Sequence, residues 1–149
     1  MQLIIATKAI SPNDPFVKSL KTYKYRNEVK LMVDLQEEEL VKITAAAYAF
    51  VYAVQQNGFY AQVIQAMQCE VPVIASNTAI MTEICGDAVL FTDPHVFENI
   101  ADKMMLLFKD ENKRNELITK GKQQAAQYPL AKTNQLLWQN IVKCAGITD

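Results

Sequence analysis

The fold is decided by residues 50–94, FVYAVQQNGFYAQVIQAMQCEVPVIASNTAIMTEICGDAVLFTDP. An apolar run at 49–54 is followed by a turn with a glycine, an amphipathic segment at 60–69 and a second apolar run at 71–75. This order predicts a strand, a helix and a parallel strand, because parallel neighbours need a crossover connection. Such sheets bind ligands beyond the carboxyl ends of their strands, so we expect the functional residues to follow the strands.

The same alternation extends over the rest of the chain. Apolar runs predict strands at 3–6, 30–33, 49–54, 71–75 and 88–91. Amphipathic segments predict helices at 16–23, 36–47, 60–69, 80–85, 95–109, 111–127 and 130–144. Asp34 is expected to cap the helix that has three glutamates in its first turn. We therefore expect a doubly wound α/β fold, a parallel sheet of about five strands with additional C-terminal helices, in one domain over 1–149.

Composition and charge exclude several classes of function. Fifteen basic and sixteen acidic residues leave a net charge of −1, and no basic stripe indicates a nucleic-acid partner. Cys69, Cys85 and Cys144 have no metal-ligand spacing, so we expect reduced thiols and no metal. No apolar run approaches the ~20 residues of a membrane span, and the first residues do not resemble a secretion signal. These features predict a cytoplasmic protein.

The turn after the strand at 49–54 is the best candidate for a site. Gly58 lets the backbone approach a ligand, and the amides at the start of the next helix attract an anion such as a diphosphate. Asn57 and Gln65, eight residues apart, both reach one extended ligand lying across that helix start. Two alternatives stay open, because Asn57 also suits a helix cap and Gln65 an exposed helical position.

Several short motifs occur in a fixed order along the chain. They are Phe50-Val51, Gly58-Phe59, Ala66-Met67, the segment PVIASN at 72–77, Glu83, GDA at 86–88 and DP at 93–94. In these motifs the chain resembles the C-terminal, nucleotide-sugar-binding domain of retaining glycosyltransferases of family 4, which have the two-domain GT-B architecture. The resemblance covers most of the chain.

The resemblance implies a function and a set of site residues. It implies that the chain binds a nucleoside-diphosphate sugar, needs no cofactor and is the donor side of a hexosyl transfer enzyme. Asn57 occupies a catalytic position, and the donor-binding positions are Lys8, Gly58, Phe59, Tyr60, Ala61, Gln65 and Glu83.

The chain departs from the family at the two positions that matter most for catalysis. The family has glutamates where this chain has Asn57 and Gln65. An amide carries no charge and has only one accepting end, so it holds ribose hydroxyls less well and does not stabilise a developing positive charge. Tyr60 adds bulk near the phosphates. The family also has an N-terminal acceptor domain and one more strand before the first strand seen here, so we expect the isolated chain to be inactive.

Three functions remain open. The first is the donor half of a sugar transferase, which needs the acceptor domain or a partner chain. The second is a binding or regulatory module that has the same fold without the chemistry. The third is an unrelated α/β domain that pairs with another chain or with itself.

Trp138, with Leu136, Leu137 and Ile141, forms a helical stripe that suits a core or a domain-packing surface. His95 is expected to cap a helix or to be solvated, and the KMMLLF segment at 103–108 to lie in the core.

Overall fold

The computed structural model describes residues 2–54 and 60–145. The chain forms two compact units, which divide after Ile43. The described strands lie in two sheets, and every strand pair is parallel.

The first unit contains a two-stranded sheet and its crossover helix. Strands β1 (Leu3–Thr7) and β2 (Val29–Val33) pair in parallel, and helix α1 (Pro15–Thr22) and the short turn η1 (Arg26–Glu28) connect them. Asp14 is the N-cap residue of α1, and its carboxylate accepts from the amide of Phe16 at 2.8 Å. This side-chain cap and the proline in the first turn explain why the helix starts there.

Helix α2 (Glu37–Ala45) begins later than the sequence indicates. The expectation that Asp34 caps it is wrong, because Asp34 has a φ of 55° and donates its amide to the carbonyl of Thr7 at 2.9 Å. Aspartate tolerates this left-handed conformation, which ends β2 instead of opening a helix. The carboxylate of Glu39 accepts from the amide of Gln36 at 3.0 Å and so satisfies the helix start.

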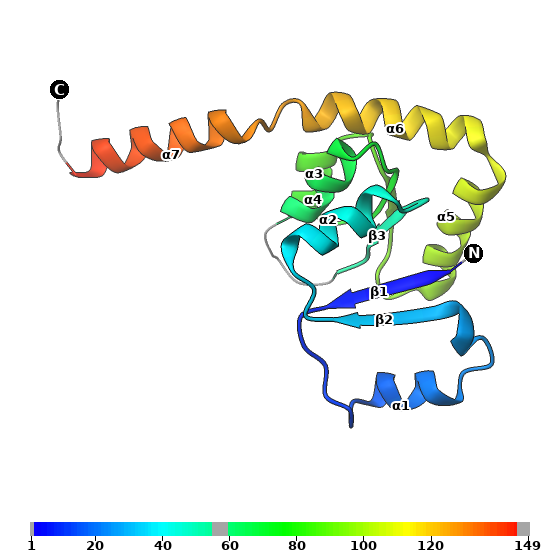
Figure 1. The fold of residues 1–149 in the computed structure, drawn as a ribbon. Coiled ribbons are helices and arrows are strands. Elements are labelled where there is room, and N and C mark those ends of the chain that lie inside the picture. Colours follow the sequence, from blue (N-terminus) through cyan, green and yellow to red (C-terminus); the bar gives the residue numbers. More distant parts are fainter. Residues whose placement is uncertain (1, 55–59, 146–149) are drawn as a thin grey trace. The chain divides into compact units, whose positions relative to one another are not determined.

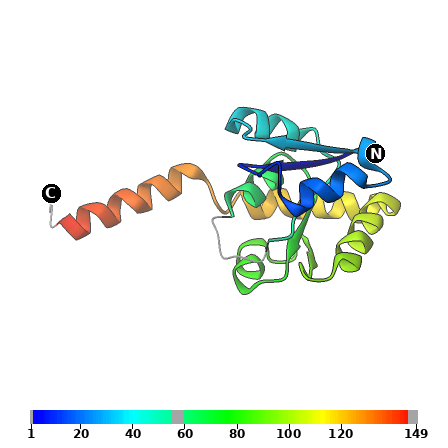
Figure 2. The ribbon, with the colours of Figure 1, turned by 90° about the horizontal axis from the view of Figure 1, so that it is seen from below.

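The second unit is built on a three-stranded parallel sheet. Its strands are β3 (Phe50–Tyr52), β4 (Val73–Ser76) and β5 (Leu90–Thr92), in the order β3-β4-β5. Helices α3 (Ala61–Gln68) and α4 (Ala79–Cys85) connect consecutive strands, as Figures 1 and 2 show. Every residue of β4 is buried, as expected for a central strand covered on both faces.

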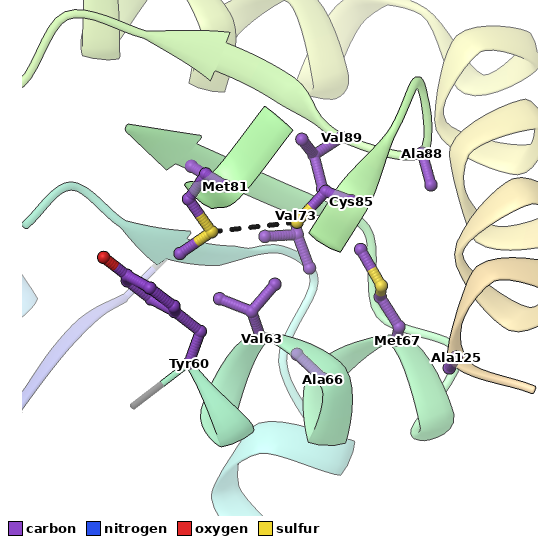
Figure 3. Packing of buried hydrophobic residues seen from close by; sticks show 11 residues of the cluster. Tyr60, Val63, Ala66, Met67, Val73, Met81, Cys85, Ala88, Val89 and Ala125 are labelled. Atoms are coloured by element: carbon purple, nitrogen blue, oxygen red, sulfur yellow. Dashed lines mark hydrogen bonds between the residues drawn. The ribbon is translucent and has the colours of Figure 1, made fainter. Parts of the chain in front are cut away.

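Two apolar clusters cover the two faces of this sheet. On one face, α3 and α4 contribute Val63, Met67, Met81 and Cys85, which surround Val73 of β4 (Figure 3). On the other face, Ile74 packs with residues of helices α5 (Phe97–Lys109) and α6 (Glu111–Ala125). Alternate residues of β4 therefore serve opposite clusters, which is the strand periodicity of two.

Helix α6 packs closely against α3. Gly121 is buried, and a Cβ added to it would lie 3.3 Å from Cγ of Met67. The side-chain amide of Gln124 donates to the carbonyl of Ile84 at 2.6 Å, and Lys120 forms an ion pair with Asp87 at 2.6 Å. These contacts fix α6 against the α3–α4 side of the unit.

Helix α7 (Leu130–Ala145) differs from the other helices of the unit. No described side chain in it is buried, and Trp138 is 66% exposed. Both ribbon views show α7 extending away from the helices that precede it in the second unit (Figures 1 and 2). None of the described helices is both long enough and apolar enough to cross a membrane.

The five predicted strands and seven predicted helices are confirmed, with boundaries that differ by a few residues. The strands lie in two sheets and not in one, because the hydrophobic pattern identifies strands without specifying how they pair. The Met-rich segment is only partly core, since Leu107 is buried but Met105 is 49% and Phe108 59% exposed. The Trp138 stripe is not part of a core among the described residues.

Candidate functional site

The candidate site lies at the carboxyl end of β3, where the chain enters α3. Three predicted site residues, Asn57, Gly58 and Phe59, lie outside the described residues. The described part resumes at Tyr60, which occupies the N-cap position of α3 and makes no side-chain cap hydrogen bond. The first amides of an α-helix have no partner within the helix, so this start is able to receive an acceptor from outside.

Tyr60 supports the helix start from the protein interior. Only 7% of the residue is exposed, and its ring packs edge-on against Tyr52, with centroids 6.0 Å apart. Figure 3 shows the ring beside Val63 and Met81. Burial, and to a smaller extent the adjacent Tyr60, raises the pKa of Tyr52. The ring of Tyr60 therefore belongs to the core, and a donor contact by this residue would use its backbone.

Ala61 and Gln65 lie one helical turn apart on the same side of α3, and both are half-buried. The side chain of Gln65 has no hydrogen-bond partner among the described residues. The structure also identifies Gln62, whose buried Oε1 atom has no partner in the described part of the chain. Nothing in the sequence distinguishes Gln62 from an exposed helical glutamine.

Glu83 lies on the solvent side of α4. It is exposed, whereas Met81 and Cys85 on the same helix are buried in the cluster shared with α3.

Burial raises the pKa of the Cys85 thiol to about 11, so the thiol packs as a neutral group. The three cysteines are free thiols, as predicted.

Lys8 follows β1 in the first unit and is exposed. The structure thus places Tyr60, Ala61 and Gln65 together on α3, Glu83 on the neighbouring helix α4, and Lys8 in the other unit. Within the described ranges, no group of histidine, cysteine, aspartate and glutamate side chains has the arrangement of a metal site.

A separate hollow lies at the carboxyl ends of β4 and β5. It measures about 240 Å³ and is lined by Asn77, Thr78, Asp93, Pro94 and His95. The expectation that His95 begins a helix needs correction, because α5 begins at Phe97. The amide of His95 instead donates to Oδ1 of Asp93 at 2.9 Å. His95 itself is exposed, as the solvated alternative predicts.

Comparison with known proteins gives matches along most of the chain. Residues 7–124 match the family described as "Glycosyl transferases group 1". O-antigen chain mannosyltransferase B of Escherichia coli is 35% identical over 104 residues, which make up 70% of this chain and 25% of that protein. The chain therefore spans about a quarter of the length of this relative.

Solved glycosyltransferase structures share the fold. Sucrose-phosphate synthase from Thermosynechococcus elongatus superposes with a TM-score of 0.85 at 17% identity, over 99% of this chain and 39% of that one. HepE of Anabaena, solved with UDP and glucose, gives a TM-score of 0.81 at 19% identity, over 95% of this chain and 40% of that one. The family match over most of the sequence and this shared architecture lead to one assignment. The chain belongs to the group 1 family of glycosyl transferases.

Proposed function

We propose that the chain binds a nucleoside-diphosphate sugar at the start of α3 and is the donor side of a hexosyl transfer enzyme. One observation carries this proposal: among the described residues, no side chain caps the start of α3 at Tyr60. Helices α1, α4 and α6 are capped by the side chains of Asp14, Thr78 and Asp110. The first amides of a helix that lacks a side-chain cap are able to donate to an anion, and a pyrophosphate fits that geometry.

Helix α5 is the useful internal comparison. It also begins without a side-chain cap, at Val96. The loop before it carries Asp93, whose negative charge disfavours a diphosphate. The similarity to HepE, which was solved with UDP and glucose, supports the choice of ligand.

Calorimetric titration of the whole chain with UDP and with GDP tests the proposal. We expect measurable heat from at least one diphosphate at millimolar concentration, and weaker binding of the corresponding monophosphate. Absence of heat from both diphosphates would overturn the proposal.

Gln65→Glu tests the ribose contact. A carboxylate accepts hydrogen bonds from two hydroxyls at once, so this variant should bind a nucleotide sugar more tightly. Gln68→Glu is the matched control, because Gln68 lies on the same helix and is exposed. An equal effect of the two substitutions would exclude a direct contact by Gln65. Asn57→Glu, added to Gln65→Glu, should strengthen binding of the sugar part.

A second candidate function is a nucleotide-binding module without turnover. The amide at Gln65 favours it, because the position has no carboxylate to hold the ribose and the side chain has no partner among the described residues. Calorimetric titration with UDP-glucose distinguishes the two functions, because the isolated chain is expected to be inactive under both. Tighter binding by the double variant Asn57→Glu/Gln65→Glu supports the donor half of an enzyme, whereas an unchanged affinity supports the module.

The proposed enzyme needs an acceptor-binding partner, either an N-terminal domain or a separate chain. The exposed stripe on α7 supports this, since Leu137 is 59% and Trp138 66% exposed. Trp138 is the only tryptophan in the sequence, so its fluorescence reports on α7 alone. We expect solvent-exposed emission from the chain at low concentration. A blue shift that appears together with dimer formation would indicate self-association through α7.

Assignment to family 4 and location in the cytoplasm are further parts of the proposal. The donor contact is also proposed to need no metal, so nucleotide binding should be unchanged by EDTA. A loss of binding in EDTA that magnesium restores would overturn this part.

A further inference from the structure

The hollow lined by Asn77, Thr78, Asp93, Pro94 and His95 shares none of the residues assigned to the proposed donor site at α3. It lies entirely within the second unit, where the chain leaves β4 and β5. Parallel sheets bind ligands at this edge, so its position alone makes it a candidate. We infer that the hollow is a subsite for one neutral sugar ring, held mainly by Asn77 and Asp93. This inference deepens the proposed sugar-transfer function and rests on it.

Hydrogen bonds hold the two loops that line the hollow, which follow β4 and β5. The amide of Asn77 donates to the carbonyl of Thr92 at 2.9 Å, which ties the loop after β4 to the end of β5. The buried hydroxyl of Ser76 donates to the carbonyl of Val54 at 2.8 Å. The buried hydroxyl of Thr92 donates to the side-chain oxygen of Asn99 at 3.2 Å. The two loops are therefore held together before any ligand arrives, which lowers the entropic cost of binding.

Asn77, Thr78 and Asp93 present polar groups at the surface of the hollow. The side-chain amide of Asn77 is exposed and has no partner among the described residues. Asp93 uses Oδ1 to accept from the amide of His95, and its Oδ2 atom has no partner in the described part of the chain. The hydroxyl of Thr78 accepts from the amide of Met81 at 3.3 Å and is able to donate its own proton. The hollow thus offers one amide, one carboxylate oxygen and one hydroxyl donor.

These groups select the chemical class of the ligand. Among the described residues, Asp93 is the only carboxylate lining the hollow, and one carboxylate is too few for a divalent cation. The same negative charge repels a phosphate. A neutral ring with adjacent hydroxyls satisfies both Asn77 and Asp93, because each hydroxyl both donates and accepts. The volume of about 240 Å³ lies below that of drug-sized pockets, about 300 Å³ and more, and suits one ring.

Saturation-transfer NMR of the whole chain with methyl α-mannopyranoside and methyl α-glucopyranoside tests the inference. We expect transfer from at least one glycoside at millimolar concentration. Asn77→Ala should weaken it about three- to tenfold, the effect of one lost hydrogen bond, and Asp93→Asn should weaken it by a similar factor. The matched controls are Asn112→Ala and Asp102→Asn, which change exposed residues outside the hollow and should have no effect.

Absence of transfer from both glycosides, or equal transfer in Asn77→Ala and its control, would overturn the inference. Repeating the NMR measurement with saturating UDP shows whether the glycoside binds at this subsite or at the proposed donor site. If the glycoside signal persists while UDP binds, the subsite is independent of the nucleotide, and if UDP displaces the glycoside, the inference fails. If UDP does not bind while the Asn77-dependent glycoside signal remains, the proposed donor site at α3 fails, and the hollow binds a sugar without a role in transfer.

Discussion

Helices α3 and α7 have a similar amphipathic sequence pattern and very different environments. Helix α3 buries Val63, Ala66 and Met67, whereas α7 buries none of its described side chains. Both have an apolar face, and only α3 has it covered by elements of the described chain. The comparison shows that helical periodicity identifies an apolar face without showing whether the same chain covers it.

Shortening a side chain on each helix should give the largest contrast. Met67 is 1% exposed, so Met67→Ala should lower the free energy of unfolding by about 2–5 kcal/mol, through lost burial and a cavity. Leu137 is 59% exposed, so Leu137→Ala should change it by no more than about 0.5 kcal/mol. Urea unfolding followed by circular dichroism measures both. A loss above 1 kcal/mol for Leu137→Ala would show that α7 is packed in solution.

The close approach of α6 to α3 gives the next largest effect. A Cβ at Gly121 would lie 3.3 Å from Cγ of Met67, so Gly121→Leu should destabilise the protein by about 1–3 kcal/mol through overpacking. Ala126→Leu is the control, because Ala126 follows the same helix and is exposed. Equal unfolding midpoints for the two variants would contradict the contact between α3 and α6.

In the second unit, α4 begins with a side-chain cap, whereas the N-cap residue of α3 makes no side-chain cap hydrogen bond. Thr78 caps α4 by accepting from the amide of Met81, so Thr78→Ala should cost about 1 kcal/mol of stability. Thr119→Ala removes an exposed hydroxyl from the middle of α6 and is the control. If the two substitutions were equivalent in thermal unfolding, the cap on α4 would make no net contribution.

Acid should destabilise the fold slightly by breaking ion pairs within α6 and should leave α7 unaffected, with the smallest effect of the four. Hydrogen bonds from Lys113 and Lys120 lower the pKa of Glu116 from 4.5 to about 2. A carboxyl with a lowered pKa stabilises the fold above its unfolded pKa, and this contribution is lost as the pH falls from about 4.5 to about 2. The ion pair between Lys120 and Glu116 is partly exposed to solvent, which limits its contribution to stability.

Urea midpoints at pH 5 and pH 2.5 measure this dependence. Glu116→Gln should reduce the fall in midpoint between the two pH values. No ion pair involves α7 in the described ranges, so Lys143→Gln should leave the fall unchanged. An unaltered pH dependence in Glu116→Gln would show that other carboxyls are responsible.

Much of the candidate site was predictable because its signals are local. The apolar runs around Val51 and Ile74 and the amphipathic segment containing Gln65 predict a strand, a helix and a parallel strand, and the structure has them in that order. The burial of the Tyr60 ring against Tyr52 was not predictable, because these residues meet only after the strand and helix pack. The unpaired Oε1 of Gln62 is likewise a consequence of packing.

The sequence by itself determined the secondary structure, the parallel arrangement of the strands and the family, because short-range periodicity and ordered motifs encode them. Only the tertiary structure decided that the strands form two sheets, that Asn77 and Asp93 line one hollow, and that Trp138 has no cover among the described residues. These features depend on which surfaces meet, and contacts between residues distant in the chain leave no local pattern in the sequence.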